Sequence, residues 1–134
     1  MKLEKIKDLK IKFVEGFHNC KFHEYDGQSC LDLQGGFKSD DLERLGYESI
    51  ILGFRKTIKD GVEQIGVKLQ SLYVKDKLTG KGSEFIRYLI EFCRNNDVSY
   101  IEVDDTSITG EGFDFYGHYG FTGKVHSDSR FLYL

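Results

Sequence analysis

The sequence predicts a single α/β domain whose central sheet is mixed and mostly antiparallel. Two segments that are predicted to form strands meet at a turn. A helix with one apolar face then leads to another predicted strand. The chain has 134 residues, of which 40% are hydrophobic and 31% charged, as in ordinary globular proteins. This length suits one domain that covers residues 1–134.

The N-terminal third contains three expected elements. The β-rich segment Ile11–Phe17 predicts a strand, and Gln28–Leu33 predicts a shorter one. Ser39-Asp40-Asp41 predicts the N-cap and acidic first turn of a short helix, and Gly46 predicts the end of that helix.

The middle of the chain predicts a long hairpin followed by a helix. Ser49–Lys59 and Val62–Val74 are β-rich, and the Asp60-Gly61 pair between them is typical of a two-residue hairpin turn. Lys77–Gly82 then predicts a turn, and Asn95-Asn96 predicts the end of the helix that follows. The apolar residues of this helix share one face: Phe85, Ile86, Leu89, Ile90 and Cys93.

The C-terminal third predicts alternating short elements. Ser99–Asp104 reads as a strand, Thr106–Gly112 as a polar loop and Gly112–Tyr119 as a short aromatic helix. Gly120-Phe121 then turns into a strand pair that ends with Phe131–Leu134.

Charge and hydropathy limit the classes of partner. The net charge is −3, so we expect no broad basic surface for nucleic acid. No apolar run approaches the roughly 20 residues of a membrane helix, and the first residues lack the apolar segment of a signal peptide. The odd number of cysteines fits reduced thiols. We therefore expect a cytoplasmic protein with neither a nucleic-acid nor a membrane partner.

The turn before the main helix carries the clearest chemical signal. In Gly80-Lys81-Gly82-Ser83, glycines let backbone N–H groups approach an anion, and the helix N-terminus adds positive potential. This arrangement suits a pyrophosphate. A triphosphate-binding P-loop is excluded, because Lys75 and Gly82 stand where it needs a glycine and a serine or threonine. A dinucleotide fingerprint is excluded because Phe85 takes the place of its third glycine.

Two segments of the chain carry recognisable motifs. The first is Lys77-Leu78-Thr79-Gly80-Lys81-Gly82, and the second is Phe115-Tyr116-Gly117-His118-Tyr119-Gly120-Phe121. In this order they resemble motifs of the GNAT superfamily of N-acetyltransferases: the acetyl-CoA motif Arg/Gln-x-x-Gly-x-Gly/Ala and an aromatic pair before Gly-Phe. The resemblance extends over about Val62–Leu134.

The resemblance implies an acyltransferase with acetyl-CoA as co-substrate, bound where two strands of the sheet splay apart. The pantetheine arm is expected along Leu72, Tyr73 and Val74, with the Val74 N–H at the thioester oxygen. Tyr116 is expected to protonate the leaving thiolate, unless it is only a core aromatic residue. The expected pyrophosphate ligands are Lys77, Leu78, Thr79, Gly80, Lys81, Gly82 and Ser83.

The chain departs from the family pattern at three positions. Lys77 replaces arginine or glutamine, Asp76 stands where many relatives have proline, and Lys68 stands where many have a base glutamate on the strand. The base would then be Asp104, Asp105 or, as a weaker candidate, Glu102. A water relay is the alternative to such a base. The alternative to an enzyme is a non-catalytic domain of the same fold that binds acyl-CoA or a protein.

The acceptor is expected to be a primary amine on a small molecule or a protein. The acidic residues Asp104, Asp105, Glu111 and Asp114 would attract a cationic acceptor, or they form a solvated loop. In the N-terminal half, Gly35–Gly46 is expected to replace the family's usual helix pair and leave an open acceptor site. This abbreviation, together with Asp104-Asp105-Thr106-Ser107, is similar to small phage acetyltransferases.

Two further predictions concern metal and assembly. His18, Cys20, His23 and Cys30 do not have the spacing of a zinc site, so no metal is expected. The C-terminal strand is expected to pair within the core, and the protein is expected to be a monomer or a homodimer.

Overall fold

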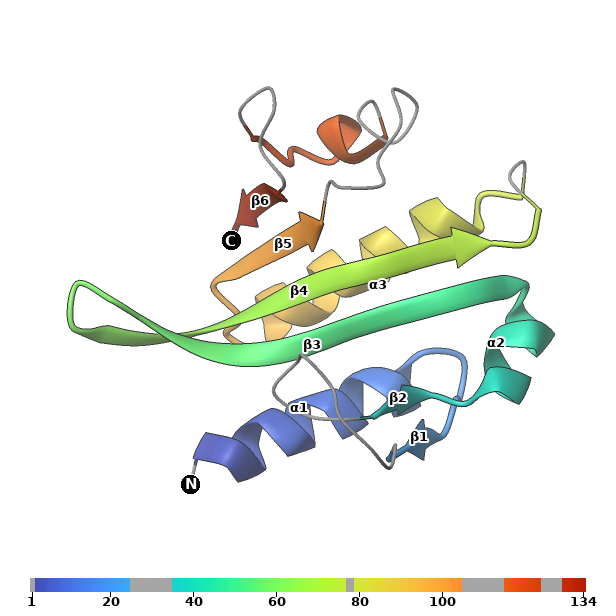
Figure 1. Cartoon of the computed structure of the whole chain (residues 1–134), viewed down its shortest axis with the longest axis horizontal. Coiled ribbons are helices and arrows are strands. Elements are labelled where there is room, and N and C mark those ends of the chain that lie inside the picture. Colours follow the sequence, from blue (N-terminus) through green and yellow to red (C-terminus); the bar gives the residue numbers. More distant parts are fainter. Residues whose placement is uncertain (1, 25–34, 77–78, 105–114, 124–128) are drawn as a thin grey trace.

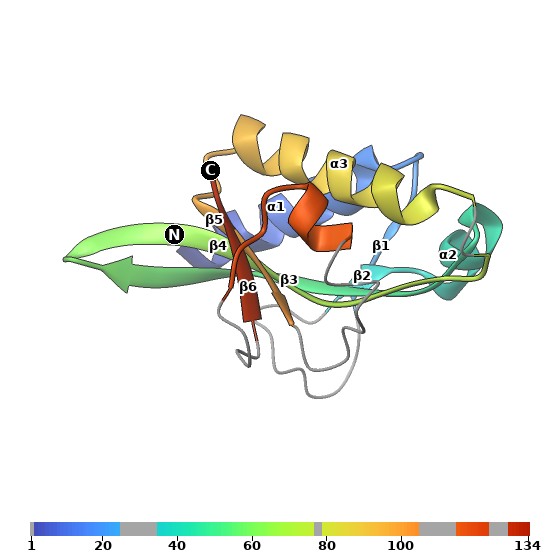
Figure 2. The same ribbon diagram turned by 90° about the horizontal axis from the view of Figure 1, so that it is seen from above.

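A computed structural model places a four-stranded sheet at the centre of the chain, with the two long helices on one of its faces (Figures 1 and 2). The structure describes residues 2–24, 35–76, 79–104, 115–123 and 129–134. Its elements are α1 (Lys2–Gly16), β1 (Phe22–His23), β2 (Gly36–Phe37), α2 (Ser39–Leu45), β3 (Tyr47–Lys59), β4 (Val62–Val74), α3 (Lys81–Asn95), β5 (Tyr100–Asp104) and β6 (Ser129–Tyr133).

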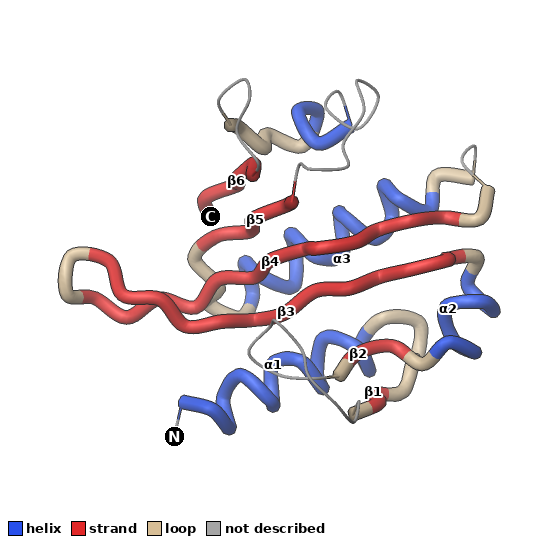
Figure 3. Tube along the Cα trace, viewed as in Figure 1, coloured by secondary structure: helices blue, strands red, loops and turns tan. Residues whose placement is uncertain are grey.

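The sheet confirms the predicted α/β class with mixed, mostly antiparallel pairing. Its strand order is β3-β4-β5-β6, in which β4 and β5 are parallel and the other two pairs antiparallel. The predicted hairpin is also confirmed. Asp60 and Gly61 have φ angles of 53° and 77°, the two positive values that a type I′ turn requires. This hairpin reaches well beyond β5 (Figure 3).

The predicted strand at Ile11–Phe17 is wrong, because this segment continues helix α1. The buried residues Ile6, Leu9, Phe13 and Phe17 recur every three or four positions, which places them on one helix face. The window Ile11–Phe17 is too short to reveal this longer period. Lys10 is buried on the same helix, and its ammonium group donates a hydrogen bond to the Leu52 carbonyl of β3.

The N-terminal half is not abbreviated as predicted, since α1 and α2 both precede the long hairpin. The predicted helix before Gly46 is confirmed as α2, and Gly46 ends it in the left-handed conformation, with φ of 89°. Ser39 is the first helical residue and not the N-cap. Lys38 occupies the cap and makes no capping hydrogen bond through its side chain.

Aromatic side chains join the two long helices to the sheet. The Phe13 ring of α1 lies 5.8 Å from the ring of Phe54 in β3. Its distances to Phe85 and Phe92 of α3 are 5.8 Å and 5.1 Å. Such pairs add to the free energy gained by burying apolar area. The predicted apolar face of α3 is confirmed, because Phe85, Ile86, Leu89, Ile90 and Cys93 are all buried.

The last third of the chain follows the predicted order where the structure describes it. Residues 115–118 are helical, as predicted. Thr122 then forms an isolated antiparallel bridge with Phe131 of β6. The predicted strand Gln28–Leu33, the predicted loop Thr106–Gly112, and the residues Cys30, Lys77, Leu78, Asp105, Glu111 and Asp114 lie outside the described residues.

Candidate functional site

The sheet opens between β4 and β5. The two strands pair in parallel only from Gly66 opposite Tyr100 to Leu69 opposite Val103. β4 continues for another five residues to Val74, whereas β5 ends at Asp104 and turns away from it (Figure 1). The predicted splay is therefore present, and the residues expected to line it, Leu72, Tyr73 and Val74, lie on the diverging part of β4.

A bulge in β4 coincides with the point where the strands separate. In the ladder with β3, Leu69 pairs with Leu52 and Ser71 pairs with Ile51, so Gln70 is an extra residue. A bulge bends its strand and increases the local twist. The bend therefore comes directly after Leu69, the last residue of β4 that pairs with β5.

The predicted glycine turn leads from the diverging end of β4 into α3. Gly80 is the N-cap of α3 and has a left-handed backbone with φ of 73°. Its carbonyl accepts a hydrogen bond from the Glu84 N–H at 3.0 Å. Just before it, the Thr79 hydroxyl donates to the Asp76 carbonyl at 2.8 Å. Since a helix leaves its first N–H groups without partners within the helix, those after Gly80 can serve as anion donors.

The two glycines of the turn leave space in front of these N–H groups. A Cβ atom added to Gly80 would meet no described atom within 4 Å. At Gly82 the nearest atom would be Cζ of Phe115, 3.5 Å away. The aromatic helix at 115–118 therefore lies against the first turn of α3. The structure thus brings together the two motifs on which the resemblance depends.

Tyr116 lies on this aromatic helix and is partly buried. Its ring packs 5.0 Å from the ring of Phe115 and 5.6 Å from that of Phe121. Burial raises the pKa of its phenol to about 12, and the nearby phenol of Tyr73 adds to the shift. The predicted acid is therefore protonated at neutral pH and lies near the diverging end of β4.

Glu102 is held in a polar cluster and is a poor candidate for the base. Lys68 and Glu102 are directly opposite each other in the β4–β5 ladder. The Glu102 carboxylate forms ion pairs with Arg55 and Lys68, the latter at 3.9 Å, and accepts a hydrogen bond from the Ser129 hydroxyl at 2.7 Å. Both of its carboxylate oxygens are therefore occupied by partners within the sheet.

The other predicted base candidates are only partly described. Asp104 is the final residue of β5, which places its backbone at the mouth of the splay, and its side chain is not among the described ones. Within the described part of the chain, no group of three or more histidine, cysteine or acidic side chains could hold a metal ion. No described helix is long and apolar enough to span a membrane.

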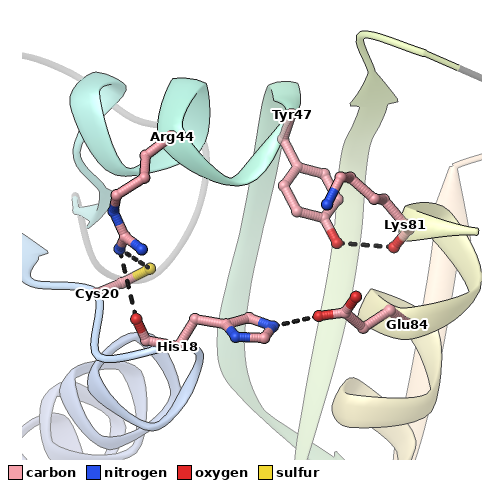
Figure 4. A network of polar contacts seen from close by, with 6 residues as sticks. All are labelled: His18, Cys20, Arg44, Tyr47, Lys81 and Glu84. Atoms are coloured by element: carbon pink, nitrogen blue, oxygen red, sulfur yellow. Dashed lines mark hydrogen bonds and ion pairs between the residues drawn. The ribbon is translucent and has the colours of Figure 1, made fainter. Parts of the chain in front are cut away.

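The sequence analysis did not predict a network of polar contacts in which residues of the N-terminal half bind the first turn of α3 (Figure 4). The Tyr47 hydroxyl donates to the Lys81 carbonyl at 2.7 Å, and the His18 ring bonds to the Glu84 carboxylate. The residues involved come from the turn after α1, the start of β3 and the first turn of α3. No local pattern links such distant segments, so only the fold reveals the contacts.

No protein-family model matches the sequence, and no curated protein matches it. Solved structures do resemble its fold. One is a mutant of the toxin AtaT bound to acetyl-CoA and the C-terminus of the antitoxin AtaR, with 13% identity and a TM-score of 0.48. That match covers 63% of this chain and 56% of the toxin, so the matched region spans little more than half of the toxin's length.

Two other solved structures show a similar likeness. Naa50 from Arabidopsis thaliana, in complex with a bisubstrate analogue, has 15% identity and a TM-score of 0.46, with 61% of each chain covered. An acetyltransferase from Streptococcus agalactiae has 16% identity and a TM-score of 0.40, with 96% of this chain and 88% of that chain covered. At identities of 13% to 16%, these likenesses concern the fold alone.

Proposed function

We propose that the protein is an N-acetyltransferase that moves an acetyl group from acetyl-CoA to a primary amine. One observation carries the proposal: the sheet opens after Leu69 and Val103, directly beside a helix that begins with a glycine turn. The opening suits an extended thiol arm, and the turn suits the pyrophosphate to which that arm is attached.

The diverging end of β4 offers backbone groups to the arm. The Lys75 N–H donates to the Gly46 carbonyl at 3.0 Å, on the side of β3. Consecutive N–H groups of a strand point to opposite edges of that strand. The Val74 N–H therefore points to the edge of β4 from which β5 has diverged. A donor there would stabilise negative charge on a thioester oxygen during attack by an amine.

The phosphate end is assigned to the first turn of α3. The N–H groups of Lys81, Gly82 and Ser83 begin this helix, and their partial positive charge favours an anion. The left-handed Gly80 directs the chain into the helix without a side chain in front of these donors. Thr79 adds a hydroxyl group near the turn, and Lys81 adds a cationic side chain.

Tyr116 is assigned as the general acid. A phenol with a pKa of about 12 keeps its proton at neutral pH and can give it to a thiolate as the C–S bond breaks. The proton from the attacking amine goes to solvent through a water relay or to a carboxylate at the end of β5. The acceptor is a primary amine on a small molecule or on a protein, cationic in solution and neutral when it attacks, and Tyr116 then regains its proton from solvent.

A matched pair of glycine variants tests the binding site. Gly80→Ala and Gly61→Ala both place a side chain at positive φ, 73° and 77°, where no described atom lies within 4 Å. Each should therefore cost about 1 kcal/mol of stability. Only Gly80→Ala should weaken acetyl-CoA binding, by roughly tenfold, because its methyl group occupies space assigned to the pyrophosphate.

Titration calorimetry with acetyl-CoA measures this difference. For the unmodified protein, acetyl-CoA at a hundred times its dissociation constant should add about 2.7 kcal/mol to the free energy of unfolding. If acetyl-CoA produces no heat and no stabilisation, the proposed function is wrong. Equal loss of binding in both variants would mean that the turn at Gly80 has no special part in it.

Tyr116→Phe tests catalysis separately from binding. We expect acetyl-CoA affinity to stay within about twofold and amine-dependent release of free thiol to fall by about a hundredfold, because the acid is lost. A thiol reagent follows the reaction, and CoA release without any amine serves as the blank. Unchanged turnover in this variant would remove Tyr116 from the mechanism.

A non-catalytic domain that binds acyl-CoA is the second candidate. It is favoured by Lys68 at the position of the usual base and by Glu102, whose carboxylate is bound to Arg55, Lys68 and Ser129. The two candidates differ in one measurement. Binding of acetyl-CoA with no amine-dependent thiol release, over a panel of cationic amines and peptides, would select the binding domain.

A further inference from the structure

We propose that Tyr47 is a positioning residue for the pyrophosphate site, an inference that rests on the proposed function. Its side chain is 2% exposed and belongs to the first residue of β3. The phenol crosses to α3 and donates a hydrogen bond to the carbonyl oxygen of Lys81, at 2.7 Å (Figure 4).

This hydrogen bond acts on one of the proposed phosphate donors. The Lys81 carbonyl and the Gly82 N–H belong to the same planar peptide group, so fixing the oxygen also fixes the direction of the N–H. A donor bound to the oxygen also polarises the peptide and makes its N–H a stronger donor. Tyr47 thereby orients and strengthens the Gly82 N–H without touching the ligand.

The surroundings of Tyr47 hold its hydroxyl in place. Its ring lies 6.0 Å from the ring of Phe17 and 6.3 Å from that of Phe85, so α1 and α3 both restrict it. Tyr47 is also opposite Val74 in the β3–β4 ladder. One residue therefore connects the diverging end of β4 with the first turn of α3, the two parts of the proposed site.

Neighbouring contacts restrain the same turn. The side chain of Lys81 packs over Gly46, where an added Cβ would lie 2.8 Å from Lys81 Cε. The His18 ring bonds to Glu84 one turn along α3, and the Arg44 guanidinium donates to the His18 carbonyl at 3.4 Å. Figure 4 shows His18 directed at Glu84, with Arg44 reaching the His18 backbone from α2. The turn is therefore held by the protein before any ligand binds, which lowers the entropy lost on binding.

The chain offers a matched control for a Tyr47→Phe variant. The Tyr88 hydroxyl also donates to a backbone carbonyl, that of Phe13, at the same distance of 2.7 Å. Tyr88 lies on α3 as well, and its phenol is also desolvated by burial. Its bond restrains α1 and not the glycine turn. Tyr88→Phe therefore removes the same chemical interaction from the same helix, away from the proposed phosphate donors.

The experiment compares the dissociation constants of CoA and of S-acetylpantetheine, which lacks the pyrophosphate, for the unmodified protein and both variants. Both variants should lose similar thermal stability. We expect Tyr47→Phe to weaken CoA binding about fivefold, the effect of one neutral hydrogen bond, and to leave S-acetylpantetheine within about twofold. Tyr88→Phe should leave both constants within about twofold.

Each contrary result has a distinct meaning. No CoA binding by the unmodified protein would overturn the proposed function, and the role of Tyr47 with it. CoA binding that is equal in the unmodified protein and in Tyr47→Phe would overturn the role of Tyr47 alone. A Tyr47→Phe variant that loses CoA and S-acetylpantetheine equally would show that the hydroxyl supports the whole site, which also overturns a role specific to the pyrophosphate.

Discussion

The two halves of β4 differ in what surrounds them. From Gly66 to Leu69 the strand lies between β3 and β5, and Lys68 contributes to a polar cluster that involves all four strands. After the bulge at Gln70, residues Ser71 to Val74 follow β3 but have left β5. One strand thus has a closed half within the sheet and an open half at the proposed site.

This difference separates stability from binding along one strand. In the closed half, buried side chains and ladder hydrogen bonds hold the sheet together. In the open half, backbone groups at the edge are available to a ligand, and the bulge at Gln70 marks the change. If this division holds, substitutions in the closed half should change the free energy of unfolding and leave acetyl-CoA affinity nearly unchanged.

The largest effect on stability is expected from Glu102→Ala. This change leaves Arg55 and Lys68 without the carboxylate between them, and solvent reaches these cations only in part, with exposed side-chain fractions of 32% and 26%. We expect a loss of about 3 kcal/mol in urea denaturation, at the lower end of values for broken buried ion pairs. Calorimetry below the melting temperature should give an unchanged dissociation constant for acetyl-CoA.

Glu63→Ala is the control for this prediction. It breaks the pair between Lys56 and Glu63, whose side chains are 27% and 46% exposed, in the part of the hairpin beyond β5. An exposed pair is worth less than about 1 kcal/mol. Equal destabilisation by the two variants would contradict the central role given to Glu102, and a large change in acetyl-CoA affinity would contradict the division between the halves.

A smaller effect is expected from Gly66→Ala, also in the closed half. The ring of Tyr100 lies across this glycine from the neighbouring strand, and an added Cβ would lie 2.1 Å from its Cζ. The ring must move off the glycine, which disturbs its packing with Phe131 and Tyr133, so we expect a loss of about 2 kcal/mol. In a Tyr100→Ala background the same change should cost clearly less. Equal costs in both backgrounds would show that the ring is not the obstacle.

The sequence predicted the elements with strong local signals. Asp60-Gly61 specified its hairpin because few residue pairs accept two positive φ angles, and the helical spacing from Phe85 to Cys93 specified α3. Helix α1 was not predicted because the seven residues Ile11–Phe17 are too few to distinguish the periodicity of a helix from that of a strand. The longer spacing from Ile6 to Phe17 does distinguish them.

The proposed site was predictable only in its local parts. The glycine turn and Tyr116 each belong to a short motif, and the structure brings Phe115, next to Tyr116, against Gly82. The hydrogen bond from Tyr47 to Lys81 and the pairing of Lys68 with Glu102 depend on strand register. No periodicity within a segment encodes such contacts between segments, so they could not be predicted from the sequence.

The smallest effect concerns Tyr116 at alkaline pH. Its pKa is about 12 in the folded protein because of burial, and an unfolded tyrosine has a pKa of about 10. Between these values the folded state keeps a proton that the unfolded state has lost. The stability contributed by Tyr116 is thus fully present below pH 10 and is lost as the pH rises towards 12.

The Tyr116→Phe variant should therefore lose stability less steeply in this range. We expect its free energy of unfolding, measured in urea at a series of pH values, to fall by up to about 1.4 kcal/mol less per pH unit than that of the unmodified protein. The remaining slope belongs to other buried groups, including Tyr88 and Cys93, whose pKa values are raised to about 12. Tyr133→Phe, at a side chain that is 66% exposed, is the control. Parallel curves for the unmodified protein and Tyr116→Phe would mean that the phenol is open to solvent, and an acid so exposed would not be shielded at the open half of β4.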